Sequence, residues 1–114
     1  MALHYNLSKV YAISDNDQEF AKQIVTLFTE EVPAEIKNIK NGLEDKDHTM
    51  VYHAAHKIKP TLDLLGMELA YEDVLAIEKW AKAEGKRKEI KDVVKSLRQH
   101  VENTLKEVKK NYNL

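Results

Sequence analysis

The stretch that decides the fold runs from His53 to Gly66 and reads HAAHKIKPTLDLLG. On a helical wheel of about 100° per residue, its apolar residues fall within one sector of about 80°, the width of a stripe that faces a protein core. With the residue two places before the stretch, that stripe consists of Val51, Ala55, Ile58, Leu62 and Leu65. His56 lies nearly opposite its centre, on a largely polar face. The stretch therefore predicts an amphipathic helix that presents one imidazole to solvent, with Lys59 one turn further on.

The rest of the chain also reads as helix, because it holds only three glycines and two prolines and shows no alternating strand pattern. We predict one short helix and four longer ones. Counted from their caps, the ranges are 7–13, 16–42, 47–65, 68–83 and 88–112.

Start and stop signals set these limits. Asn16, with Glu19 three residues later, has the spacing of a capping box, and Asp47 is the expected N-cap of the helix that contains the opening stretch. Gly66 follows the end of that helix and can take a positive φ. Gly85 is expected to close the next helix.

Pro33 lies inside the second helix, where a proline removes one backbone donor and crowds the preceding turn. The apolar period resumes afterwards, so we expect a bend near 29–33 rather than a break. The last two helices carry core-facing stripes at helical spacing. These are Leu69, Val74, Ile77 and Ala81 in the first, and Ile90, Val94, Leu97, Val101, Leu105, Val108 and Tyr112 in the second.

These elements predict an all-α protein with a single domain over residues 1–114. Four amphipathic helices joined by short turns most simply form an antiparallel four-helix bundle. The short N-terminal helix is expected to cap one end of it.

Composition excludes several classes of function. The chain has no cysteine, so disulfides and thiolate metal sites are absent. Its formal net charge of -1 gives no reason to expect a nucleic-acid or anionic-membrane partner. No apolar run approaches the roughly 18 residues of a membrane span, and the first ten residues contain no signal-peptide core. We therefore expect a soluble, cytoplasmic protein.

The residues around His56 resemble the signature of histidine-containing phosphotransfer (HPt) domains. The matching residues are Ala55 just before the histidine, Ile58 at +2, Lys59 at +3, Pro60 at +4, Thr61 at +5, Leu65 at +9 and Gly66 at +10. The order of a short first helix, a long proline-bearing second helix and further amphipathic helices also resembles that family, over nearly the whole chain.

This resemblance implies a phosphorelay intermediate of bacterial-type two-component signalling, with no kinase activity of its own. His56 is then the phospho-acceptor, through Nε2, and it passes the phosphoryl group from one receiver aspartate to another. Lys59 matches the lysine that neutralises the phosphoryl oxygens, and Lys57 is a further candidate for that role. The implied partners are response-regulator receiver domains and a hybrid sensor histidine kinase.

General chemistry agrees with these roles. An imidazole is partly neutral near pH 7 and can act as a nucleophile without an adjacent base. Phosphoryl transfer asks mainly for positioning and for neutralisation of charge. No cofactor is expected, because the family's partner receiver brings the magnesium and this stretch offers only one nearby carboxylate, Asp63.

Pro60 departs from the family pattern, which usually has glycine at +4. As an interior helix proline it leaves the carbonyl of His56 without its usual donor. We hypothesise a local kink or widened turn between these two residues that re-aims the ring. Gly66, also part of the motif, is interpreted as a helix end.

Two other interpretations were weighed. His48, His53 and His56 could be taken as a metal cluster, but a competent site wants three or four convergent ligands, and no Asp or Glu is suitably spaced. His53 is a poor phospho-acceptor because its +3 residue is His56 rather than a lysine. The alternative function is a non-phosphorylated helical adaptor that binds receivers or other signalling proteins.

A partner that reaches His56 must also touch the neighbouring helix, expected to be the second. The candidate docking residues, where the core leaves them free, are Phe28, Val32, Ile36, Tyr52 and Leu64. An exposed histidine that meets two different partners suits a monomer.

Overall fold

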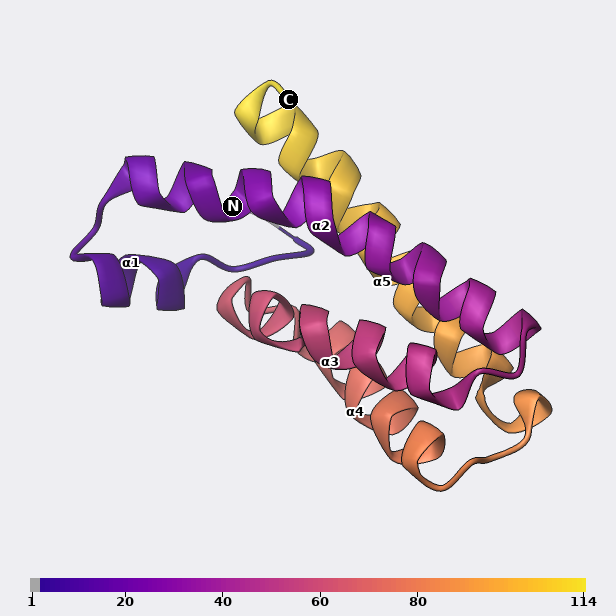
Figure 1. Cartoon of the computed structure of the whole chain (residues 1–114). Coiled ribbons are helices and arrows are strands. Elements are labelled where there is room, and N and C mark those ends of the chain that lie inside the picture. Colours follow the sequence, from indigo (N-terminus) through magenta and orange to yellow (C-terminus); the bar gives the residue numbers. More distant parts are fainter. Residues whose placement is uncertain (1–2) are drawn as a thin grey trace.

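The computed structural model describes residues 3–114 and is helical in every regular element (Figure 1). The helices are α1 (Ser8–Ser14), α2 (Gln18–Glu44), α3 (His48–Leu64), α4 (Glu68–Lys82) and α5 (Arg87–Tyr112). The described part of the chain contains no strand, so the predicted all-α class is confirmed. Within it, no helix is both long enough and apolar enough to cross a membrane.

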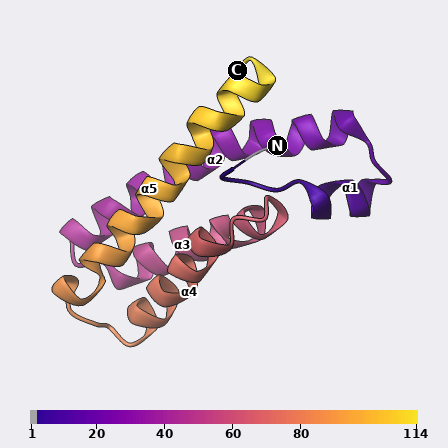
Figure 2. The same ribbon diagram turned by 180° about the vertical axis from the view of Figure 1, so that it is seen from behind.

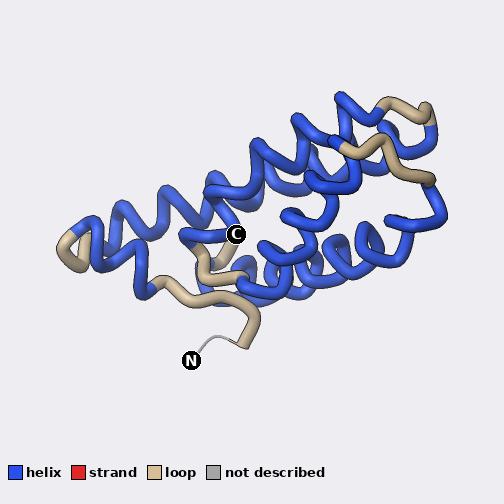
Figure 3. The backbone as a smooth tube through the Cα atoms, turned by 90° about the horizontal axis from the view of Figure 1, so that it is seen from below, coloured by secondary structure: helices blue, strands red, loops and turns tan. Residues whose placement is uncertain are grey.

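The four longer helices pack in a ring. α3 lies against α2 and α4, and α5 lies against α4 and α2, while α1 packs on α2. Figure 2 shows the same arrangement from behind, and Figure 3 shows that short loops join successive helices. The core between them is mainly apolar, with Thr104 of α5 as a buried polar residue. Its largest fully buried side chains are Phe28, Ile39, Ile58, Leu62, Leu65, Ile77 and Leu97, with five valines.

The caps of α2 and α3 show where local sequence signals succeed and fail. Asp47 caps α3 as predicted, because its carboxylate accepts a hydrogen bond of 3.0 Å from the Met50 amide. The predicted cap of α2 is wrong by one residue. Asp17 accepts from the Phe20 amide at 3.1 Å, whereas Asn16 takes a φ of 65° in the turn that follows α1. A residue in that left-handed conformation cannot also serve as the extended N-cap.

Pro33 stands inside α2, which remains one helix from end to end. Both ribbon views show α2 changing direction part-way along its length (Figures 1 and 2). The prediction that Pro33 does not break the helix is confirmed, while the position of the bend near 29–33 stays a prediction.

The turn after α4 corrects a second expectation. The residue with left-handed backbone is Glu84, at φ 51°, and not Gly85. Gly85 is needed for a different reason, since a Cβ there would overlap the indole ring of Trp80. Leu69, predicted to face inward, is 62% exposed, and Ala70 takes the buried position instead. The buried stripe of α4 therefore begins at Ala70, one residue later than the spacing predicted.

The N-terminal segment ties two distant parts of the bundle together. The Asn6 amide donates to the Leu65 carbonyl at 2.7 Å, beside the loop that joins α3 to α4. The amides of Leu3 and His4 donate to the Glu107 carboxylate on α5, at 2.9–3.0 Å. Tyr5, between them, is buried in the core.

Candidate functional site

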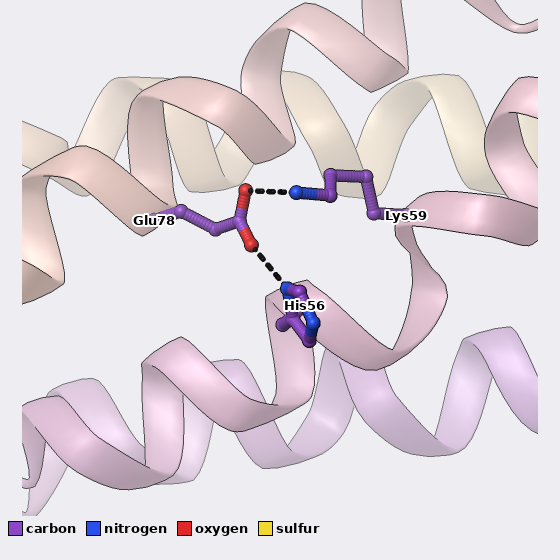
Figure 4. A network of polar contacts seen from close by, with 3 residues as sticks. All are labelled: His56, Lys59 and Glu78. Carbon is purple, nitrogen blue, oxygen red and sulfur yellow. Dashed lines mark hydrogen bonds and ion pairs between the residues drawn. The ribbon is translucent and has the colours of Figure 1, made fainter.

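His56 lies on the outer face of α3 with its side chain 58% exposed, as the helical wheel predicted. Its ring is not free in solvent, however. The Nδ1 atom lies 2.8 Å from Oε2 of Glu78, a residue of α4 (Figure 4). The histidine is therefore held by the helix next to its own.

This contact fixes which ring nitrogen carries the proton. A carboxylate can only accept hydrogen bonds, so Nδ1 must be the donor whether the ring is neutral or protonated. In the neutral ring the remaining nitrogen, Nε2, then holds an unprotonated lone pair. Since most of the side chain is exposed, that lone pair is the nucleophile that the site can offer to another molecule.

Lys59 shares the same carboxylate. Its Nζ donates to the second oxygen of Glu78, Oε1, at 3.0 Å (Figure 4). The imidazole and the ammonium therefore meet at one group, and that group is a side chain of this chain. The Glu78 carboxylate thus holds the Lys59 ammonium close to the His56 ring.

Glu78 is the residue that sequence reasoning missed. Burial acts to raise its pKa, but hydrogen bonds from His56 and Lys59 outweigh burial and hold the pKa below its usual value. Lys59 in turn has its pKa raised, mainly by the hydrogen bond to Glu78. The group is therefore an anion at neutral pH.

A signal for Glu78 was present in the sequence. It stands four residues after Val74 and three before Ala81, so it interrupts the buried stripe of α4 with a charge. A charged residue in an apolar stripe is seldom fully buried unless a partner compensates it. That rule predicts a cation or a hydrogen-bond donor opposite it, although it does not say which residue.

Lys57 takes part in a second pair, on the other side of α3. Its Nζ lies 3.0 Å from Oε2 of Glu35, a buried residue of α2 that also accepts from the Asn38 amide group. Hydrogen bonding to Glu35 raises the pKa of Lys57. The structure therefore separates the two lysines: Lys59 points to α4 with His56, and Lys57 points to α2.

The docking candidates divide into two groups. Phe28, Val32 and Ile36 are buried in the core, so none of them can present its side chain to a partner. Their prediction as docking residues is corrected, because the apolar side of α2 faces inward along this length. Tyr52 and Leu64 on α3 are partly exposed and stay candidates.

Pro60 lies inside α3 and Gly66 follows the end of that helix, as predicted. The chain is α-helical at every position from His48 to Leu64, which leaves no room for a widened turn at Pro60. A kink there stays a prediction. Gly66 follows the helix with a φ of 62°, the left-handed conformation expected of a helix end.

The other histidines of α3 have separate surroundings. The ring of His48 packs on Trp80, with centroids 4.8 Å apart, and its Nε2 lies 2.8 Å from the Gly85 carbonyl. His53 is exposed and meets the edge of the Tyr52 ring. Over residues 3–114, no group of three or more side chains of the metal-binding types is arranged to hold an ion.

Comparison with known proteins gives one match. The family described as "Hpt domain" matches residues 23–110, a range that contains His56, Lys59 and Glu78. The comparisons with curated proteins and with solved structures found no match.

Proposed function

The chain belongs to the Hpt domain family, whose members carry phosphoryl groups in two-component signalling, and on that premise we propose that His56 is the phospho-acceptor of a phosphorelay. It takes the phosphoryl group from the phospho-aspartate of one receiver domain and passes it to the aspartate of another. The observation that carries this proposal is the exposed ring whose Nδ1 is held by Glu78 and whose Nε2 is left bare.

The transfer step follows from that protonation state. The Nε2 lone pair attacks the phosphorus of the incoming aspartyl phosphate, and the bond from phosphorus to the aspartate oxygen breaks with its electron pair remaining on the carboxylate. The proton stays on Nδ1, so the phosphorylated ring is cationic. Glu78, already 2.8 Å away, offsets that charge. Transfer onward to the next aspartate is the reverse of the same step.

Lys59 is assigned to the phosphoryl oxygens. Its ammonium lies beside His56 on a flexible four-carbon stem, and its side chain is 25% exposed. It can therefore turn from Glu78 toward a phosphoryl group on Nε2. Lys57 is a weaker candidate, because its pair with Glu35 directs it to the other side of the helix.

The proposed partners are response-regulator receiver domains and a hybrid sensor histidine kinase. We expect magnesium to arrive with the receiver and this chain to need no cofactor and to have no kinase activity. We further propose a cytoplasmic monomer, and an antiparallel four-helix bundle as the arrangement of α2 to α5. The docking face would then include Tyr52 and Leu64.

The proposal is tested by incubating the chain with a phosphorylated receiver domain. The matched pair of variants is His56→Gln and His53→Gln, because both histidines are exposed on α3 and only the first contacts Glu78. We expect acid-labile, alkali-stable phosphate on the wild type and on His53→Gln, and none on His56→Gln.

Two results would contradict the proposal. Phosphate that persists on His56→Gln would place the acceptor elsewhere. Tight binding of a receiver with no label on any variant would favour the helical adaptor, a protein that binds signalling partners without carrying phosphate.

A further inference from the structure

The His56 ring has a second contact, with Tyr52, one turn earlier on α3. The two rings are nearly parallel, with an interplanar angle of 12° and centroids 5.6 Å apart. This separation and angle lie within the range of an offset stack. Tyr52 is a candidate docking residue, and it has no part in the bond-making steps of the proposed phosphoryl transfer.

The hydrogen bond from Nδ1 to Glu78 constrains one ring atom of His56. The ring is also tethered through its Cβ atom, so the freedom that remains is limited rotation about χ1 and χ2, and χ2 of a histidine has broad energy wells. A parallel neighbouring ring narrows that remaining freedom, because it favours one orientation of the ring plane. Together the two contacts restrict the direction of the Nε2 lone pair.

Tyr52 is itself held in place from α4. The ammonium of Lys82 lies over its ring, 5.2 Å from the centroid, within the distance of a cation–π contact. The ring also packs against the hydrophobic core. Lys82 stands one turn after Glu78 on α4, as Tyr52 stands one turn before His56 on α3. The contact between His56 and Glu78 and the contact between Tyr52 and Lys82 therefore join the same faces of α3 and α4.

We infer that Tyr52, supported by Lys82, is a positioning residue that sets the plane of the His56 ring and so the direction in which Nε2 meets a phosphoryl donor. This inference rests on the proposed function of His56. In-line transfer tolerates an error of only about 10–20° in the approach of the reacting atom. Losing the stack should therefore slow transfer without removing the acceptor.

The test compares Tyr52→Leu, Tyr52→Phe and Lys82→Met with the wild type. Tyr112→Leu is the matched control, since Tyr112 is another partly buried tyrosine packed on the core, on α5. We expect transfer from a phosphorylated receiver to fall about three- to tenfold in Tyr52→Leu, the range that an aromatic pair contributes. Tyr52→Phe should restore the rate, Lys82→Met should give a smaller fall, and Tyr112→Leu should leave it unchanged.

A second readout reports the ring itself. In nuclear magnetic resonance spectra of the unphosphorylated chain, the carbon-bound ring protons of His56 should be shifted upfield by the Tyr52 ring. The shift should disappear in Tyr52→Leu and persist in Tyr52→Phe and Tyr112→Leu. A loss of general stability would not produce this pattern.

The two readouts separate this inference from the proposed function. If Tyr52→Leu changes the His56 signals but no variant accepts phosphate, the stack is supported and the phosphorelay is refuted. If the wild type accepts phosphate but Tyr52→Leu transfers as fast as Tyr112→Leu, Tyr52 is not a positioning residue. Unchanged His56 signals in Tyr52→Leu would overturn the inference whatever the transfer assay shows.

Discussion

At the scale of single residues, Glu78 supplies the negative charge of the site and determines which ring nitrogen of His56 carries the proton. It is a buried carboxylate that accepts hydrogen bonds from His56 and Lys59. A buried ion of this kind stabilises the fold only while its partners are present. Its two oxygens are divided between the nucleophile and the cation, so the same group that settles α4 against α3 also selects the tautomer of the histidine.

Glu78→Gln should therefore lower stability by about 1–3 kcal/mol at pH 7, the contribution of hydrogen bonds to a charged group. The folded pKa of Glu78 lies below its ordinary value of 4.5, so the folded chain holds that proton less tightly than the unfolded chain. The stabilisation is full above about pH 4.5 and is lost as pH falls through the folded pKa. Urea denaturation at a series of pH values measures both effects.

We expect the free energy of unfolding of Glu78→Gln to lie below that of the wild type by an amount that is constant near neutral pH. This gap in stability should narrow in acid. Glu72→Gln, an exposed change on the same helix, is the control and should show almost no gap. A gap that widens as pH falls would mean that Glu78 is not held as an anion.

Pro60 carries a second prediction at this scale. It lies in the interior of α3, where a proline leaves the His56 carbonyl without a helical donor. Pro60→Ala should raise the free energy of unfolding by about 1–3 kcal/mol, because alanine restores that donor and removes the steric conflict of the ring. Urea denaturation gives the size of the effect, and amide exchange at residue 60 shows whether the new bond forms. Thr61→Ala, which adds no backbone donor, is the control; equal stability of Pro60→Ala and wild type would show that α3 has already adjusted to the proline.

The sequence predicts those site residues whose signal lies within one helix, and it does not predict contacts between helices. His56 and Lys59 follow from their spacing and from a polar face opposite an apolar stripe, which are local properties of one helix. Glu78 lies on another helix, so its contact depends on how α3 and α4 pack, and no local pattern specifies that. Phe28, Val32 and Ile36 failed as docking residues for the same reason, since spacing alone cannot say which neighbour covers a stripe.

At the scale of elements, helix existence was predictable and helix ends were less so. Asp47 and Gly66 signal their ends through their own backbone chemistry, and both were predicted. Asn16 and Gly85 were assigned the wrong roles. Asn16 belongs to the turn that ends α1, where its amide donates to the Tyr11 carbonyl, and Gly85 leaves room for the Trp80 ring rather than taking the left-handed conformation. Pro33 does not end α2, because the apolar stripe continues on both sides of the proline.

Gly66 provides the prediction at this scale. Its φ of 62° is unfavourable for any residue with a Cβ, and an added Cβ would lie 2.8 Å from Cβ of Asn6. Gly66→Ala should therefore destabilise the chain by about 2–4 kcal/mol, combining left-handed strain with the overlap. Thermal unfolding measures the loss, and Gly66→Asn, which tolerates the backbone conformation better, should separate the two contributions. A fully stable Gly66→Ala variant would argue against the close approach of the N-terminal segment to the loop between α3 and α4.

At the scale of the whole molecule, α3 is fixed from both sides. Glu35 of α2 holds Lys57, and Glu78 of α4 holds His56 and Lys59. These pairs lie at the edges of the two interfaces that bury the apolar side of α3. His56 therefore stands on a helix whose movement against either neighbour would break an ion pair with a buried carboxylate. A firmly held helix suits the proposed phospho-acceptor, because phosphoryl transfer depends on the positioning of the reacting atom.

The N-terminal segment extends this rigidity to the far end of the bundle, and Tyr5 tests it. Tyr5 is buried, and its hydroxyl oxygen accepts a hydrogen bond of 2.8 Å from the side-chain amide of Asn111 on α5. Tyr5→Ala should cost about 2–4 kcal/mol by removing a buried ring, whereas Tyr5→Phe should cost about 0.5–1.5 kcal/mol by removing only the hydrogen bond. Urea denaturation compares the two.

The same variants show whether the two ends of the molecule are coupled. The Asn6 amide of the N-terminal segment donates to the carbonyl of Leu65, which directly follows α3 and lies more than two helical turns beyond His56. Tyr5 belongs to the same core cluster as residues of α3 and α4, but its hydrogen bond is made to Asn111 on α5, and neither His56 nor Glu78 is its partner. We therefore expect the His56 ring signals to be the same in Tyr5→Ala as in the wild type under conditions in which both are folded. A change in those signals would show that the N-terminal segment sets the position of α3, and the rigidity of α3 would then depend on a contact at the opposite end of the bundle.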